Sequence, residues 1–234
     1  MHRGRLLGVS NAVTTVARPS IDAVRGAIGK AEDGARRRSG SVHLLAVSKA
    51  RTVAEVRAAH GHGLRHFGEN YVQEAIAKVQ ALADLDITWH FIGAIQSNKT
   101  QDLARHFQWI HTVDRTKVAR RLSAAAERDL DVCIQVNIDA EPQKAGVDPD
   151  ELPALVSCVA DLPRLKLRGL MVIPEPGNPR DSFRRTRQLF DALSPSAGEH
   201  WDTLSMGMSD DFADAIAEGA TLVRIGTAIF GPRT

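Results

Sequence analysis

The sequence has little cysteine, and this scarcity excludes several kinds of site. Only two of its 234 residues are cysteines, Cys133 and Cys158, and each lies within an apolar run. No Cys-x-x-Cys pair or mixed Cys/His spacing of the kind that binds zinc surrounds them. We therefore interpret both as packed thiols and expect neither a disulfide framework nor a metal site.

Long apolar runs and a strong excess of one charge are also missing. No stretch of 18 apolar residues occurs, and the basic start of the chain lacks the apolar segment of a signal peptide. The net charge is +2, from 30 basic and 28 acidic residues, which indicates neither a nucleic-acid nor a membrane partner. We expect a cytoplasmic protein in which residues 1–17 form a mobile tail.

What the chain does contain is a repeated alternation of apolar strands and amphipathic helices. Its hydrophobic content of 43% with 25% charged residues suits a chain that buries a core. After a helix over residues 21–38, eight apolar runs are each separated by a helical stretch, and the first of these helices opens with the capping box Thr52-Val-Ala-Glu55. The eight predicted strands lie in 43–49, 64–70, 88–93, 109–113, 131–138, 166–173, 203–209 and 222–230.

Such alternation predicts a parallel sheet, since every parallel connection needs a crossover. Eight units and this length favour a single closed (β/α)8 TIM barrel over residues 18–234. The alternative is an open doubly wound sheet, but no Gly-x-Gly-x-x-Gly follows the first strand. In such barrels the active site forms at the C-terminal ends of the strands, so polar residues that close the apolar runs are the candidates.

Lys49 closes the first run, at a position where a barrel interior would lower the pKa of an amine and make it a nucleophile toward an aldehyde. The other interpretation is a solvated lysine at a strand end. Polar residues also close the second, third and fifth runs, at 69–70, 96–98 and 137. Because parallel strands end at the same edge, all of these would face one mouth.

The last two runs, LSMGMSDD (204–211) and VRIGTAIFG (223–231), predict a phosphate site. Loops after the seventh and eighth strands of these barrels commonly hold a phosphate with backbone N–H groups and hydroxyls. Ser205, Gly226 and Thr227 would supply them, with Gly207 leaving room for the group. We assign Ser209 only to capping the helix at 210–211. Arg224 enters the barrel and needs a partner, either a ligand such as a pyridine nitrogen or a structural acceptor.

These residues belong to segments that together resemble a known family. The segments are AVSKA (46–50), HFGENYVQE (66–74), WHFIGAIQSNK (89–99), QVNID (135–139), GLMVIP (169–174), LSMGMSDD (204–211) and VRIGTAIFG (223–231). In this order they closely resemble the YggS-type pyridoxal-phosphate homeostasis proteins, which look like the barrel domain of alanine racemases. Two departures stand beside the match: Ala50-Arg51 where the family often has Thr-Lys, and Gly93-Ala94-Ile95 where it often has Gly-Pro-Leu.

The resemblance implies a barrel that binds pyridoxal 5′-phosphate as an internal aldimine on Lys49. By the same matching, Arg224 would face the pyridine nitrogen, Ser205, Gly226 and Thr227 would hold the phosphate, and Asn70 would lie beside the ring. The implied role is non-catalytic intracellular homeostasis of the cofactor, with pyridoxal-phosphate-dependent apoenzymes as recipients. Nothing in the composition demands a dimer, so we expect a monomer.

Two alternatives stay open, an amino-acid racemase or related pyridoxal-phosphate enzyme, and a phosphate-binding barrel in which Lys49 is structural. A racemase needs bases on both faces of its substrate. The barrels that this family resembles take the second base, a tyrosine, from an added domain, whereas this chain has a single tyrosine, Tyr71, for which we favour a packing role. We expect binding and exchange rather than catalysis.

Histidines in the sequence give two further expectations. His60, His62 and His66 lie close together but straddle a helix end and a strand, so we do not expect a shared metal. His90 lies in the third run and could point toward the site or form a hydrogen bond in the core, and we favour the core.

Overall fold

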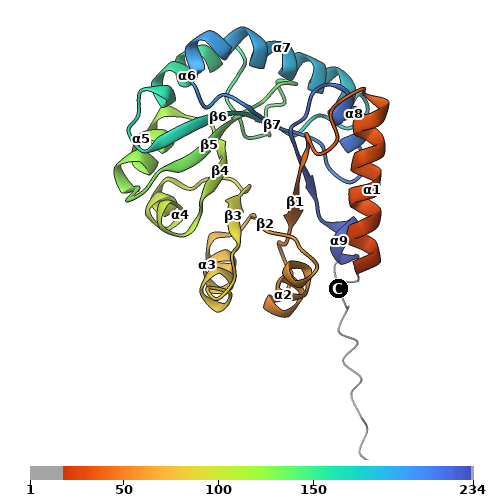
Figure 1. Ribbon diagram of the computed structural model, residues 1–234. Coiled ribbons are helices and arrows are strands. Elements are labelled where there is room, and N and C mark those ends of the chain that lie inside the picture. Colours follow the sequence, from red (N-terminus) through yellow and green to blue (C-terminus); the bar gives the residue numbers. More distant parts are fainter. Residues whose placement is uncertain (1–17, 233–234) are drawn as a thin grey trace, which may run out of the picture.

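The computed structural model describes residues 18–232, which form a closed barrel of eight parallel strands in sequential order from β1 to β8 (Figure 1). Each strand pairs with its sequence neighbours, and β1 closes the ring by pairing with β8. The strands are β1 His43–Val47, β2 His66–Glu69, β3 Thr88–Phe91, β4 Trp109–Val113, β5 Leu130–Val136, β6 Leu165–Val172, β7 Thr203–Ser205 and β8 Leu222–Ile225. The predicted TIM barrel is confirmed.

Helices cover the outside of this barrel (Figure 1). They are α1 Arg18–Gly34, α2 Val53–Gly61, α3 Val72–Ala81, the 3₁₀ turn η1 Ser97–Lys99, α4 Thr100–His106, α5 Thr116–Ala125, α6 Leu152–Ala160, α7 Pro179–Ala197, α8 Phe212–Ala217 and α9 Thr227–Phe230. Helix α1 precedes the first strand and packs against α8 and α9. It buries Ile21, Val24 and Ile28, the face that the sequence pattern predicts.

The ends of several elements differ from the predicted ranges. The capping box is confirmed, because the Thr52 hydroxyl accepts from the Glu55 N–H while the Glu55 carboxylate accepts from the Thr52 N–H. The seventh strand stops at Ser205, since Gly207 turns the chain at φ +94°. The eighth ends at Ile225, where α9 follows. The tail expected over residues 1–17 lies outside the described residues.

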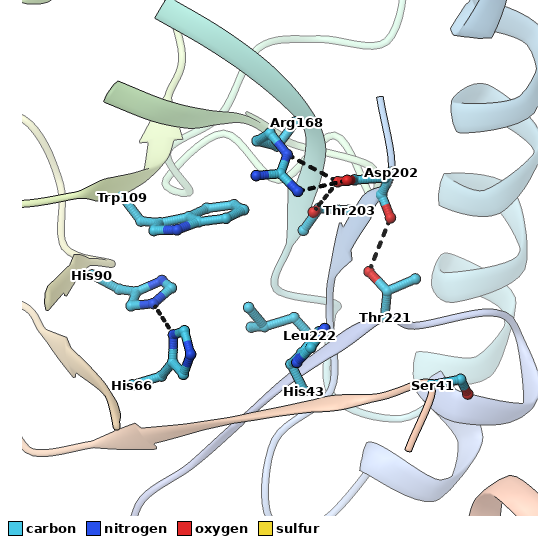
Figure 2. A pocket seen from close by; sticks show the side chains of 10 residues that line it. All are labelled: Ser41, His43, His66, His90, Trp109, Arg168, Asp202, Thr203, Thr221 and Leu222. Atoms are coloured by element: carbon cyan, nitrogen blue, oxygen red, sulfur yellow. Dashed lines mark hydrogen bonds and ion pairs between the residues drawn. The ribbon is translucent and has the colours of Figure 1, made fainter. Parts of the chain in front are cut away.

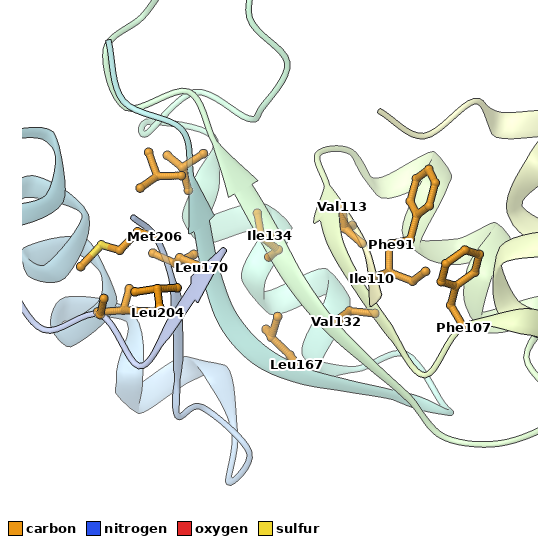
Figure 3. Packing of buried hydrophobic residues seen from close by; sticks show 14 of the residues in the cluster. Phe91, Phe107, Ile110, Val113, Val132, Ile134, Leu167, Leu170, Leu204 and Met206 are labelled. Carbon is orange, nitrogen blue, oxygen red and sulfur yellow. The ribbon is translucent and has the colours of Figure 1, made fainter. Parts of the chain in front are cut away.

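The apolar core has two parts. A large cluster fills the layer between strands and helices, and Figure 3 shows part of it around Phe91, Ile110 and Leu170. A separate small cluster of Leu45, Ile92 and Leu222 has Val47 packed against it. Burial of these apolar side chains stabilises the barrel.

The two cysteines match their predicted role unequally. Cys133 is fully buried, and burial raises the pKa of its thiol, whereas Cys158 is only half-buried on α6. Within residues 18–232, no helix is long and apolar enough to cross a bilayer.

Candidate functional site

The turn after β1 carries Lys49 and is fixed by the next strand–helix unit. Ser48 donates its hydroxyl to Oε1 of Glu69 at 2.6 Å and its N–H to the Gly68 carbonyl at 2.9 Å. Ala50 has a left-handed φ of 58°, and its N–H donates to Oε1 of Glu74 at 2.7 Å. Lys49 is half-buried between these two anchored residues. Its backbone position is therefore set by carboxylates from β2 and α3.

A buried lysine joins these carboxylates. Lys78 on α3 is 4% exposed and donates to Glu69 at 2.8 Å, to Glu74 at 2.6 Å and to the Ser48 carbonyl at 2.7 Å. Burial raises the pKa of Glu69, and the Lys78 charge opposes that rise. Lys78 is not among the residues predicted from the sequence, although its i, i+4 spacing from Glu74 indicates an ion pair.

Asn70 follows β2 beside this network. Its Oδ1 is buried and has no hydrogen-bond partner among residues 18–232, and the same holds for Oε2 of Glu69. Buried polar atoms without partners are uncommon in native proteins, so a ligand or water must satisfy these two. The Glu69 carboxylate contacts Ser48 in the turn that carries Lys49, and Asn70 is the next residue along the chain.

Tyr71 does not have the packing role that we favoured. Its side chain is 62% exposed, because residue 71 is the N-cap of α3 and stands outside the helix–sheet interface. It lines a cavity of about 330 Å³ together with Asn70, Gly93 and Lys99. The only tyrosine of the chain is thus at the surface of the C-terminal mouth.

Arg224 lies inside the barrel and is 4% exposed. It donates from one terminal nitrogen to the Ser205 carbonyl at 2.6 Å and the Ser205 hydroxyl at 3.0 Å, and from the other to the Val172 carbonyl at 2.9 Å. Burial lowers the pKa of Arg224 to about 10, with Asp211 and Cys133 opposing the shift, so the guanidinium stays charged at neutral pH. Carbonyl and hydroxyl oxygens fix its orientation in place of a directly bonded carboxylate.

Ser205 is fully buried at the end of β7, with its hydroxyl engaged by Arg224 and by Nδ1 of His111 at 2.9 Å. Gly226 and Thr227, by contrast, are half-buried and exposed at the start of α9. The first N–H groups of a helix have no acceptor within it and can bind an anion. A Cβ on Gly226 would lie 3.3 Å from the Val47 carbonyl, so this position suits a residue without a side chain.

One expectation for the β7–α8 loop is wrong and another stays untested. Gly207 lies against α8, where a Cβ would lie 2.7 Å from that of Ala215, so the missing side chain lets α8 approach the strand. That Gly207 also leaves room for a phosphate stays a prediction. Ser209 does not cap the helix. Asp211 is the N-cap, and its carboxylate accepts from the Met208 N–H at 2.6 Å.

The predicted site residues come from four strands that are neighbours in the ring. Ser205, Arg224, Lys49 and Asn70 lie on or directly after β7, β8, β1 and β2. Gly226 and Thr227 follow β8 at the same edge. The barrel therefore brings to one mouth an amine, a buried amide oxygen without a partner, a helix start and a buried cation.

Arg51, one of the two departures from the family pattern, bonds to α2 and to the residues that follow α9. Arg51 is 7% exposed, donates to the carbonyls of Gly231 and Pro232 and forms an ion pair with Glu55 at 3.4 Å. Arg51 therefore links Glu55 in the first turn of α2 to the residues that follow α9.

His90 has the core role that we favoured. It is 1% exposed and hydrogen-bonds to the rings of His66 and His111. His60 instead pairs with Asp86 at 2.6 Å, so His60 and His66 have different partners.

Comparison with known proteins places this architecture in context. The family model of the alanine racemase N-terminal domain matches residues 30–234. The chain is 53% identical over 221 residues to the pyridoxal phosphate homeostasis protein of Pseudomonas aeruginosa, covering 92% of this chain and 94% of that one. It is 46% identical over 219 residues to the protein of the same name from Escherichia coli K12, covering 90% and 94%.

Solved structures give the same result for the fold. PipY of Synechococcus elongatus with PLP bound aligns with a TM-score of 0.81 at 39% identity, covering 92% of this chain and 99% of that chain. Alanine racemase from Corynebacterium glutamicum aligns with a TM-score of 0.69 at 17% identity, covering 93% of this chain and 62% of that one, and shares the fold.

Proposed function

Because the chain belongs to the pyridoxal phosphate homeostasis proteins of the alanine racemase N-terminal domain family, we propose that it binds pyridoxal 5′-phosphate through Lys49. The observation that carries this proposal is the convergence of Lys49, Asn70, Arg224 and Thr227 at one mouth, from three adjacent strands. The cofactor, when bound, supplies an aldehyde that captures an amine and a pyridine ring that withdraws electrons.

The residues at the mouth fit the parts of this cofactor. Lys49 offers a half-buried amine on a turn held by Glu69 and Glu74. The partnerless Oδ1 of Asn70 needs a donor, which a ligand beside Lys49 can provide. Gly226 and Thr227 present backbone N–H groups and an exposed hydroxyl for the phosphate. Contact of Ser205 with the phosphate stays a prediction.

We propose that the cofactor is held and released rather than used for catalysis. Arg224 keeps its proton at neutral pH, because its pKa is about 10, so as the partner of the pyridine nitrogen it would donate a hydrogen bond and leave that nitrogen unprotonated. An unprotonated ring is a weaker electron sink, which disfavours carbanion chemistry. This supports a role in intracellular cofactor homeostasis. We further propose pyridoxal-phosphate-dependent apoenzymes as recipients and a monomer as the binding unit.

Borohydride reduction followed by peptide mass spectrometry tests the proposal. After incubation with pyridoxal 5′-phosphate, we expect a phosphopyridoxyl group on Lys49 and none in Lys49→Ala. Lys99→Ala is the matched control, because Lys99 lines the cavity at the same mouth. An adduct that persists in Lys49→Ala would contradict the assignment. Steady racemisation of an amino acid that Lys49→Ala abolishes would favour an enzyme instead.

A further inference from the structure

Three histidines form a continuous line through the interior of the barrel. Nδ1 of His66 lies 3.0 Å from Nε2 of His90, and Nδ1 of His90 lies 2.9 Å from Nε2 of His111. Figure 2 shows the first of these links. Nδ1 of His111 lies 2.9 Å from the Ser205 hydroxyl, which accepts from Arg224. The line thus ends at the arginine of the candidate site.

Strand register explains why the rings meet. His66 pairs with Thr88, and His90 lies two residues further along β3, while His90 in turn pairs with Trp109, two residues before His111. A step of two residues keeps the side chain on the same face and advances it by about 6.6 Å along the strand. The three side chains therefore climb diagonally from the N-terminal mouth toward the C-terminal mouth.

The outer end of the line opens into a cavity at the N-terminal mouth (Figure 2). This cavity has a volume of about 300 Å³ and is lined by His66, His90, Trp109 and Arg168, among others. The guanidinium carbon of Arg168 lies 4.7 Å from the centroid of the Trp109 ring, and Arg168 forms ion pairs with Asp131 and Asp202. The cavity is on the opposite side of the barrel from Lys49.

All three imidazoles are neutral at pH 7. Burial lowers the pKa of His66, holds that of His90 well below its ordinary value and, with repulsion from Arg224, lowers that of His111 to about 3. A neutral imidazole has one N–H donor and one bare nitrogen acceptor. Each link of the line therefore has one direction.

Arg224 sets that direction because a guanidinium only donates. The Ser205 oxygen accepts from Arg224, and among the described residues His111 is the only other partner of this hydroxyl. If His111 donated to Ser205, the Ser205 proton would be buried without an acceptor, at a cost of about 1–3 kcal/mol. Ser205 therefore donates to Nδ1 of His111. His111 then donates its Nε2–H to Nδ1 of His90, and His90 donates its Nε2–H to Nδ1 of His66, which leaves the proton of His66 on Nε2.

We infer that His111 is a positioning residue of the cofactor site, which accepts the Ser205 proton and so keeps the Ser205 oxygen available to hold Arg224. His90 and His66 fix the tautomer of His111 from the far mouth. The inference depends on the proposed function in one respect: it takes the cofactor to be the group that Arg224 faces. The proton positions on the three histidines do not depend on whether a ligand is bound.

Histidine ¹⁵N NMR of the unliganded protein tests the line directly. We expect Nε2–H on His66, His90 and His111, with bare Nδ1 atoms. A proton on Nδ1 of His111, or an imidazolium at pH 7, would overturn the inference whether or not the protein binds pyridoxal 5′-phosphate. This measurement needs no variant, so it stands even if a substituted protein does not fold.

Cofactor release gives the second readout. His111→Leu removes the acceptor, and we expect release about tenfold faster than in the wild type. His111→Asn can present an amide oxygen near the Nδ1 position and should restore release to within about twofold of wild type. His43→Leu is the control, because His43 lines the cavity at the outer end of the line but is not one of the three histidines that form it.

The outcomes separate the two proposals. A wild type that acquires no borohydride-stable adduct sinks the proposed function and leaves the NMR test in force. Wild-type release in His111→Leu, or equal loss in the Leu and Asn variants, would overturn the positioning role, because the acceptor would then not be the property that matters.

Discussion

The line of histidines makes a specific prediction about stability in acid. His111 has a folded-state pKa of about 3 because burial and the neighbouring Arg224 disfavour its charged form. Its unfolded-state pKa is about 6.5, so below that pH the unfolded chain binds a proton that the folded chain refuses. The stability contributed by neutral His111 is therefore present above pH 6.5 and is lost as the pH falls toward 3.

The size of the effect follows from the two pKa values. Between pH 7 and pH 5, the linkage relation gives a loss of about 2 kcal/mol in the free energy of unfolding from His111 alone. The pKa values of His90 and His66 are also lowered, and they add to the loss in the same direction. His111→Asn removes the titration of His111, and because His111 also lowers the pKa of His90, the difference between the two proteins reports His111 together with its effect on His90.

Urea unfolding followed by circular dichroism at pH 7 and pH 5 measures this difference. We expect the wild type to lose about 2 kcal/mol more than His111→Asn over this interval. His43→Asn, at the N-terminal mouth of the barrel, controls for the removal of a histidine outside the line. Equal losses in the wild type and His111→Asn would refute the reasoning, since His111 would then titrate alike in both states.

Three further predictions concern single side chains. Lys78→Met should lower the free energy of unfolding by about 3–5 kcal/mol, because it leaves buried Glu69 without its cation, and adding Glu69→Gln should recover part of the loss in urea unfolding. Gly207→Ala should lower the thermal midpoint more than Gly40→Ala, since both have positive φ but only Gly207 lies against a helix, at Ala215 of α8. Thr227→Val should weaken pyridoxal-phosphate affinity about tenfold in an equilibrium titration at an unchanged thermal midpoint, and unchanged affinity would remove Thr227 from the phosphate site.

Much of the fold could be predicted from local sequence pattern. The alternation of apolar runs and helices sets the eight strands, and the Thr52 capping box sets the start of α2, because both depend on residues close in sequence. Position at a strand end also placed Lys49 and Asn70 at the same mouth. The direction that a loop side chain takes was less accessible, as Tyr71 and Ser209 show, because it depends on which neighbour already fills the space.

The histidine line was outside the reach of the sequence for a different reason. His66, His90 and His111 are separated by about twenty residues each, and nothing local relates them. They meet only because the stagger of the closed barrel adds two residues at each strand, and stagger is a property of the whole ring. Ser205 joins them from a distant strand, so its role could not be separated from that of a phosphate ligand by inspection of LSMGMS.

The position of this polar line also indicates where the protein obtains its stability. Barrels of this kind usually fill their interior with layers of branched apolar residues. Here the small cluster of Leu45, Ile92 and Leu222 is separate from the large cluster that packs strands against helices. Removing imidazoles and a guanidinium from water is unfavourable, and hydrogen bonds offset the cost only when every donor finds an acceptor. A barrel that needed only stability could pack leucine at these positions. Its retention of a line of hydrogen bonds from His66 to Ser205 and Arg224 is therefore best explained by the arginine at its end, whose charge must be held in one orientation.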